Sequence, residues 1–224
     1  MSRVPTGIPE LDKLIDGGFP RNSMILLSGN PGAGKTILSA TFIHEGATKY
    51  KEPGVYVCFA ESRGEFIRDM RKFGMDFESL STRDLVSVLD LSITTETDVQ
   101  SALNQILEAI TSLHAKRLVV DSITAMSVGQ KEDLGKRHLI RLLYKLIKKT
   151  DCTAIIVADM PWGTRRIGGG IEEFIADGII LMESNYNNEG VLRRELRIIK
   201  MRGTNHTQKT HEYKIGKNGI EIEV

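Results

Sequence analysis

"MILLSGNPGAGKT", residues 24–36, joins a run of apolar residues to a glycine-rich turn that ends in a lysine and a threonine. The apolar run predicts a buried strand, and the residues from Lys35 to about Tyr50 predict a helix. Gly29 to Thr36 match the pattern GxxxxGK[ST] in the strand–turn–helix context that this motif requires. A glycine-rich turn that arose by chance would not need a strand before it and a helix after it. The stretch therefore predicts a phosphate-binding loop within an α/β fold.

The residue types of this loop predict a nucleotide site. Backbone N–H groups beside the glycines can surround phosphates, and the helix N-terminus adds partial positive charge. Lys35 would reach the β- and γ-phosphates, and the Thr36 hydroxyl would bind Mg²⁺. The expected nucleotide-binding residues of the loop are Gly29, Asn30, Pro31, Gly32, Ala33, Gly34, Lys35, Thr36 and Ile37.

Apolar runs alternate with helical patterns along the rest of the chain. Further strands are expected at residues 54–60, 84–90, 117–121 and 152–158, and helical patterns at 61–74, 96–113 and 135–150. Short apolar strands that alternate with helices predict a mostly parallel sheet covered on both faces. After residue 178, strand-like segments separated by Asn/Gly turns predict an antiparallel extension of this sheet. Residues 1–224 are expected to form one α/β domain, since no repeat or linker interrupts them.

Two carboxylates follow predicted strands. Asp121 ends "RLVVD" and would lie beside the Mg²⁺, acting on it directly or through a water. Glu61 follows the strand at 54–60 and should emerge at the carboxyl end of the sheet, where ligands of open α/β sheets bind. Glu61 could orient or deprotonate an attacking water. Alternatively, it is a helix N-terminal glutamate favoured by the helix dipole.

Composition and charge exclude some classes of partner. Thirty Lys and Arg residues against 29 Asp and Glu residues give a formal charge of +1, so any binding to nucleic acid or membrane must come from a local patch. No segment resembles a signal peptide or approaches a membrane span, so a cytoplasmic protein without a membrane partner is expected. Cys58 and Cys152 lie in apolar runs and are expected to be buried free thiols.

Five segments occur in a specific order along the chain: "TGIPELDKLIDGGFPRNSMILLSGNPGAGKT", "VYVCFAESRGEFIRDMRKFGMDF", "RLVVDSITAM", "GIEEFIADGIILME" and "LRRELRIIKMRGTNH". This order resembles the single-domain KaiC-like proteins, archaeal RadA paralogues in the RecA superfamily of ATPases. The resemblance covers nearly the whole chain, and its C-terminal segment is more specific than the phosphate-binding loop. It implies a RecA-like core and a hexameric ring with ATP at each subunit interface.

The resemblance also implies a role for "KMRGTNH", residues 200–206. In the family, the lysine and arginine of this motif reach across the interface to the neighbouring subunit's γ-phosphate. Lys200 and Arg202 would then act in trans, stabilising the charge that develops on the transferred phosphoryl group. His206 matches the family's histidine and is expected to contact the neighbour's nucleotide. The alternative is an edge strand whose basic side chains discourage association between sheets.

Two residues depart from the family's pattern. Many members carry two adjacent glutamates after the second strand, where this chain has Ala60 and Glu61. RadA-like recombinases carry a glutamine near the end of the fifth strand that senses the γ-phosphate, and the matching residue here is Asp159. A carboxylate there would repel a triphosphate unless Mg²⁺, Lys or Arg compensates. Both changes predict slow hydrolysis, or a switch that mainly binds ATP.

Residues 127–135 and 160–170 are expected to face the channel of the ring, because the corresponding loops of RecA relatives hold DNA. In the second loop, Trp162 could stack on bases while Arg165 and Arg166 contact the phosphates of single-stranded DNA. Alternatively, the loop is flexible and its arginines are solvated or paired with nearby glutamates.

Three functions remain open from the sequence. They are a Mg²⁺-dependent ATPase ring with modest turnover, a regulatory ATP-binding module with little hydrolysis, and a DNA-binding accessory factor that acts with recombination or repair proteins. A phosphorylation clock is not expected, because "EEFIADGIIL" (172–181) contains no hydroxyl side chain. RadA-style filaments are not expected either, because the chain enters its core almost at once.

Overall fold

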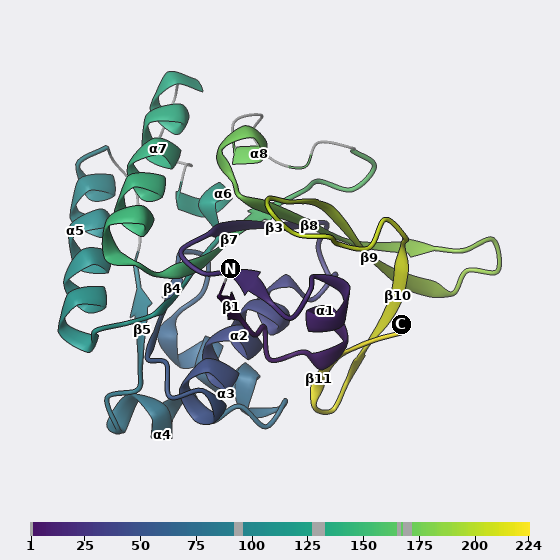
Figure 1. Ribbon diagram of the computed structural model, residues 1–224, viewed down its shortest axis with the longest axis horizontal. Helices are drawn as coiled ribbons and strands as arrows, with labels where there is room; N and C mark the ends of the chain where they lie inside the picture. Colours follow the sequence, from purple (N-terminus) through teal and green to yellow (C-terminus); the bar gives the residue numbers. More distant parts are fainter. Residues whose placement is uncertain (1, 92–95, 127–132, 165–166, 168–171) are drawn as a thin grey trace.

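The phosphate-binding loop follows the middle strand of a nine-stranded sheet (Figure 1). The computed structural model describes residues 2–91, 96–126, 133–164, 167 and 172–224. In spatial order the strands are β11 (Gly219–Ile222), β10 (His211–Gly216), β9 (Leu192–Met201), β8 (Gly178–Tyr186), β3 (Met24–Gly29), β7 (Thr153–Asp159), β6 (Arg117–Asp121), β4 (Gly54–Cys58) and β5 (Val86–Asp90).

The strand directions confirm the predicted fold class. From β8 through β3, β7, β6 and β4 to β5, all neighbouring strands are parallel. The C-terminal strands β9, β10 and β11 extend the sheet beyond β8 with antiparallel pairing. A separate antiparallel pair, β1 (Arg3–Val4) and β2 (Phe19–Pro20), lies near the N-terminus.

Helices cover both faces of the sheet (Figure 1). One face carries α1 (Pro9–Leu14), α2 (Lys35–Lys49), α3 (Arg63–Arg71) and α4 (Phe77–Thr82), and the other carries α5 (Glu96–Leu113) and α7 (Asp133–Thr150). Two further helices are short: α6 (Ile123–Met126) follows β6, and α8 (Glu172–Ile175) precedes β8. Ile25 and Leu27 of β3 face the α2 side, whereas Met24 and Leu26 face the α5 and α7 side. This alternation explains the continuous apolar sequence of β3, since both of its faces are buried.

The helical pattern at residues 61–74 extends beyond the helix that forms there. Helix α3 ends at Arg71, and Gly74 adopts a φ of 79° in the turn that follows. Helix α4, which no sequence pattern predicted, then begins after Asp76, whose carboxylate accepts a hydrogen bond from the Ser79 amide. A helix of six residues is too short to show a helical period in the sequence.

Both cysteines are buried and free, as predicted. The Cys152 thiol donates a hydrogen bond to the Ala115 carbonyl at 3.2 Å, and burial raises the pKa of both thiols. Among the helices of the described ranges, none combines the length and the apolar character that crossing a membrane requires.

Candidate nucleotide site

The predicted phosphate-binding loop lies at the carboxyl end of β3 and leads directly into α2. Gly34 precedes the helix with a φ of 86°, a conformation that favours glycine. Gly29 lies so close to β8 that a Cβ there would overlap the Met182 carbonyl oxygen. Helix α2 has no side-chain cap at its N-terminus, so its first backbone N–H groups could receive an anion.

The C-terminal strands hold this loop in place. Asn30 donates through Nδ2 to the Ser184 carbonyl at 2.7 Å, and the Ser184 amide donates to Asn30 Oδ1 at 2.8 Å. The Tyr213 hydroxyl donates to the Ala33 carbonyl. The side chain of Asn30, one of the predicted nucleotide-binding residues, therefore fixes the loop to β8.

Thr36 and Asp121, the two predicted metal ligands, are in contact. Thr36 Oγ1 and the buried Tyr56 hydroxyl both donate to Asp121 Oδ2, at 2.9 and 2.8 Å. Burial raises the pKa of Asp121, and these two hydrogen bonds partly oppose the rise. Hydroxyl and carboxylate oxygens are hard ligands, of the kind that Mg²⁺ prefers. The residues present at this end of the loop therefore fit a magnesium ion bound together with a nucleotide.

Lys35 and Asp159 form an ion pair across the carboxyl ends of β3 and β7. Lys35 Nζ lies 3.2 Å from Asp159 Oδ1 and donates to the Gly29 carbonyl at 2.8 Å. The Ser122 hydroxyl donates to the second oxygen of the Asp159 carboxylate at 2.7 Å. The carboxylate that departs from the family's pattern therefore touches the lysine of the phosphate-binding loop.

Glu61 lies between β4 and α3, partly buried, at the carboxyl end of the sheet. Burial is the main cause that raises its pKa to about 7, and the charges of Asp121, Asp69 and Glu65 raise it further. A carboxyl group with this pKa suits general-base chemistry at neutral pH. The capping of α3 is provided by Ser62 and Glu65, so Glu61 does not cap the helix that it precedes.

Lys200 and Arg202 lie at a different level of the sheet from the loop of their own chain. Lys200 pairs with Ile179 near the start of β8. The loop follows Gly29, which pairs with Met182, three residues farther along that strand. The strand register therefore separates these two cations from the loop in the same subunit.

Both cations have partners within the subunit. Lys200 Nζ donates to the Glu173 carbonyl at 3.1 Å. Arg202 Nη1 lies 3.3 Å from Asp177 Oδ1, and its Nη2 donates to the Phe174 carbonyl at 3.2 Å. Burial and the nearby charge of Arg202 lower the pKa of Lys200.

The edge-strand alternative for this segment stays open. Strand β9 lies between β8 and β10, but the described pairing of β10 covers only Glu195 and Leu196 of β9. The end of β9 that carries Lys200 lies beyond this pairing.

The remaining predicted residues lie in loops. His206 follows β9, and its Nδ1 donates to the Thr207 carbonyl at 2.8 Å. Trp162 follows β7 and is 49% exposed. Arg165 and Arg166, which belong to the same DNA-binding hypothesis, lie outside the described residues, as do residues 127–132.

Three residues that contact the site were not predicted. Tyr56 lies in an apolar strand and stacks on Phe66, with ring centroids 4.2 Å apart, so its sequence signal is that of a core residue. Ser122 follows the predicted metal ligand Asp121 directly, and only this position in the sequence could have indicated that it contacts the site. Arg194 Nε donates to the Gly32 carbonyl at 3.1 Å. This contact depends on the pairing of β9, which carries Arg194, with β8.

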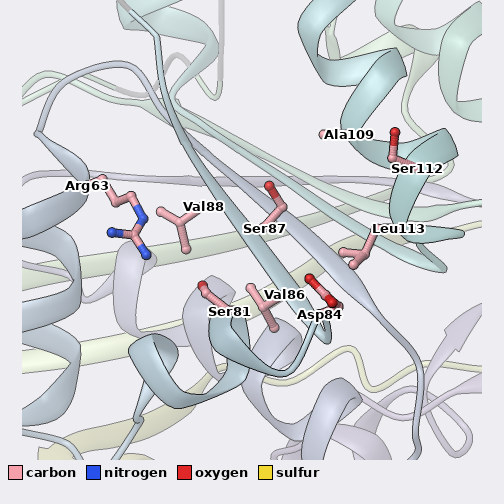
Figure 2. Close-up of a pocket in the computed structure, with 9 residues that line it drawn as sticks. All are labelled: Arg63, Ser81, Asp84, Val86, Ser87, Val88, Ala109, Ser112 and Leu113. Carbon is pink, nitrogen blue, oxygen red and sulfur yellow. The ribbon is translucent and has the colours of Figure 1, made fainter.

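A cavity of about 600 Å³ lies elsewhere, beside the edge strand β5 (Figure 2). Its lining includes Val86 and Val88 of β5, Arg63 of α3 and Leu113 of α5. None of the predicted site residues lines it. This cavity is therefore separate from the phosphate-binding loop.

Comparisons with known proteins agree with this geometry. A sequence profile for the family "ATPase: KaiC" matches residues 4–224. A UPF0273 protein from Methanocaldococcus jannaschii is 32% identical over 236 residues, which cover 99% of this chain and 96% of the relative. A UPF0273 protein from Pyrococcus horikoshii is 34% identical over 234 residues, covering 98% of this chain and 93% of the relative.

The resemblance extends to longer proteins and to a solved structure. The circadian clock oscillator protein KaiC of Prochlorococcus marinus strain MIT 9313 is 30% identical over 233 residues, covering 99% of this chain and 46% of that protein. The crystal structure of a KaiC-like protein from Pyrococcus horikoshii has a TM-score of 0.91 at 36% identity, covering 100% of this chain and 99% of that one. The chain therefore belongs to the family of KaiC-like ATPase domains, as the order of its motifs predicted.

Proposed function

We propose that residues 1–224 act as one ATP-binding domain that hydrolyses ATP slowly with Mg²⁺. The observation that carries this proposal is the contact of Thr36 Oγ1 with Asp121 Oδ2 at 2.9 Å, next to a phosphate-binding loop with Lys35. Hydroxyl and carboxylate oxygens at this position would suit Mg²⁺. Membership of a family of ATPase domains supports the same chemistry.

Each residue of the proposed site has a task that follows from its chemistry. The loop amides and Lys35 would bind the phosphates, while Thr36 and Asp121 would hold Mg²⁺, which would supply positive charge to offset that of the phosphates. Glu61 accepts a proton from the attacking water, a task that its pKa of about 7 supports. We expect turnover to be low, because Ala60 replaces the first of the family's two glutamates and Asp159 brings a negative charge to Lys35.

We further propose that the site is completed by a second subunit of a cytoplasmic hexameric ring. Lys200 and Arg202 lie away from the loop of their own chain, so a nucleotide that they contact would have to belong to a neighbour. Such cations would stabilise charge on the γ-phosphate, and His206 would lie in the same interface. The proposed contact is heterologous, and a closed ring satisfies it in every subunit.

ATP turnover at increasing protein concentration tests this proposal. We expect the rate per subunit to rise as the ring assembles and to fall at least tenfold in Glu61→Gln and in Arg202→Ala, since each removes a transition-state interaction. The Lys35→Ala variant provides the background rate. Wild type that releases phosphate no faster than Lys35→Ala would contradict hydrolysis, and an equally active Arg202→Ala ring would remove the trans contact.

A second candidate function is a regulatory module that binds ATP with negligible hydrolysis. The Asp159 carboxylate beside Lys35 favours it, because its negative charge opposes the charge that would develop on the phosphoryl group during hydrolysis. Nucleotide binding that changes the assembly state, together with background turnover, would identify this function.

A third candidate function is the binding of single-stranded DNA as a RadA paralogue in recombination or repair. The exposed indole of Trp162 favours it, because such side chains stack on unpaired bases. Fluorescence anisotropy with a labelled oligonucleotide, with and without ATP, tests this function. Unchanged binding in a Trp162/Arg165/Arg166 triple alanine variant would contradict it.

A further inference from the structure

Asp159 lies beside the phosphate-binding loop and contacts the lysine of that loop. Strand β7 runs parallel to β3, and Asp159 is paired in register with Gly29, the first residue of the phosphate-binding loop. The ion pair between Asp159 Oδ1 and Lys35 Nζ, 3.2 Å long, therefore joins the end of β7 to the lysine of the loop. The lysine of such a loop normally reaches the β- and γ-phosphates.

The Lys35 ammonium group already lies close to three oxygen atoms. It donates to the Gly29 carbonyl at 2.8 Å and to the Asn30 carbonyl at 3.3 Å, and Asp159 provides the third oxygen. An ammonium group has three N–H donors, so a phosphate oxygen that approaches Lys35 competes with these three oxygens. Of the three acceptors, only the Asp159 carboxylate carries a charge. Lys35 itself is 9% exposed, so little water screens this pair on the lysine side.

The carboxylate is held in position by the segment that follows β6. Ser122 Oγ donates to Asp159 Oδ2 at 2.7 Å, and the Asp159 amide donates to Thr124 Oγ1 at 2.9 Å. The Asp159 side chain is nevertheless 47% exposed. It can therefore turn toward solvent when a nucleotide arrives, without unfolding its surroundings.

We propose that Asp159 is an internal competitor for Lys35 that lowers the affinity for a nucleoside triphosphate more than the affinity for a diphosphate. This inference rests on the proposed function. Both nucleotides must displace the carboxylate from Lys35, so both lose affinity. A triphosphate also places its terminal phosphate beside the displaced carboxylate, and like charges at such a distance repel. Asp159 thereby brings the affinities for the two nucleotides closer together and favours release of the triphosphate.

Equilibrium binding of ADP and of a non-hydrolysable ATP analogue, both with excess Mg²⁺, tests the proposal. Asp159→Asn keeps the shape of the side chain and an oxygen that can accept from Ser122, but it removes the charge. We expect it to tighten binding of the triphosphate analogue on the order of tenfold, and binding of ADP by clearly less. The ratio of the two dissociation constants should therefore shift toward the triphosphate.

Asp151→Asn is the matched control. Asp151 is exposed and precedes the first residue of β7, at the end of the strand opposite Asp159. Its φ of 58° is one that Asn adopts readily. This variant loses the same charge, and we expect both dissociation constants to stay unchanged. A ratio that shifts equally in Asp151→Asn would overturn the proposal, because net charge would then explain the effect.

Other outcomes separate this proposal from the proposed function. Wild type that binds neither nucleotide overturns both. Wild type that binds nucleotide, with an unchanged ratio in Asp159→Asn, overturns only the role of Asp159. If Asp159→Asn does not fold, Ser122→Ala takes its place, because it removes the hydroxyl that holds the carboxylate. We expect a smaller shift of the ratio in the same direction, and an unchanged ratio in that variant contradicts the proposal.

Discussion

A single hydroxyl group connects the core of this protein with its candidate magnesium site. The Tyr56 ring packs against Phe66 and Phe77, while its hydroxyl donates to Asp121 and lies 3.1 Å from Ser39 Oγ. A buried polar group of this kind is stable only when it is hydrogen-bonded. The hydroxyl therefore also fixes the orientation of the Asp121 carboxylate toward Thr36, and we interpret Tyr56 as a positioning residue.

Tyr56→Phe tests this interpretation. The ring keeps its packing, so we expect a stability loss of only about 1 kcal/mol from the lost hydrogen bond. Because Asp121 loses a donor that orients it, a higher Mg²⁺ concentration should be needed for half-maximal nucleotide binding, by roughly threefold to tenfold. A Mg²⁺ titration with a fluorescent nucleotide measures this midpoint. Tyr144→Phe is the control, because this tyrosine lies in α7 and packs on the other face of the sheet. Equal Mg²⁺ midpoints in wild type and Tyr56→Phe would contradict the positioning role.

The raised pKa of Glu61 predicts a pH dependence of turnover. Below a pKa of about 7 the carboxyl group is protonated and cannot accept a proton, so the rate should fall about tenfold per pH unit. Above pH 7 the carboxylate is ionised and the rate should level off. Phosphate release measured between pH 5.5 and 8.5, at roughly half-unit steps, follows this curve. Glu61→Gln should abolish the step, whereas Glu78→Gln, an exposed glutamate on α4, should retain it. A wild-type profile without a step near pH 7 would exclude Glu61 as the base.

At the scale of elements, one buried cation joins α2 to the sheet. Arg117 begins β6 with no exposed surface, and its guanidinium lies 4.5 Å from the centroid of the Phe42 ring. It donates to the carbonyls of Phe42 and Pro5 at 2.8 and 2.9 Å and pairs with Glu52 at 2.8 Å. A charge this deeply buried needs such partners. The guanidinium fits below α2 because residue 46 of that helix is glycine, where a Cβ would overlap the Arg117 side chain.

Two glycine-to-alanine substitutions in helices should therefore act in opposite directions. Gly46→Ala should destabilise the protein by about 1–3 kcal/mol, because Arg117 is held by its hydrogen bonds and cannot move aside. Gly64→Ala in α3 should be neutral or stabilise by up to about 1 kcal/mol, since no atom lies within 4 Å of the new Cβ. Urea unfolding measures both free energies. A Gly46→Ala protein as stable as Gly64→Ala would show that this packing is not tight.

At the scale of the whole molecule, the C-terminal strands connect the phosphate-binding loop with the cations Lys200 and Arg202. Strand β8 holds the phosphate-binding loop through Ser184, and its partner β9 ends with Lys200 and Met201, directly before Arg202. One hairpin therefore contacts the phosphate-binding loop of its own subunit and carries cations toward what we propose is the next subunit.

A mixing experiment tests whether the active site is shared between subunits. Lys35→Ala lacks the lysine of the loop, and Arg202→Ala lacks the proposed trans cation, so each protein alone should be close to inactive. In rings assembled from equal amounts, about a quarter of the interfaces combine an intact loop with an intact Arg202. ATP turnover of the mixture should therefore recover to roughly a quarter of the wild-type rate. If the mixture stays as inactive as its parts, although it forms mixed rings, Arg202 does not act across the interface.

Much of the fold was predictable because its signals are local. The phosphate-binding loop, the alternation of strands and helices, and the antiparallel C-terminal segments each depend on residues that are close in the sequence. The same holds for the residues whose position follows from a strand end, such as Thr36 and Asp121. Helix α4 and the small β1–β2 pair were not predicted, because two to six residues are too few to show a period.

The residue chemistry of the nucleotide site and the class of the fold could thus be derived from the order of amino acids. Which side chains meet could not. Thr36 and Asp121 are 85 residues apart, and Asn30 and Ser184 are 154 residues apart. Their contacts exist because the sheet places β8, β3, β7, β6 and β4 side by side in a particular register. The ion pair between Lys35 and Asp159 follows from that register. The register is set by the packing of the whole sheet and its two helical layers, and no local sequence pattern encodes it.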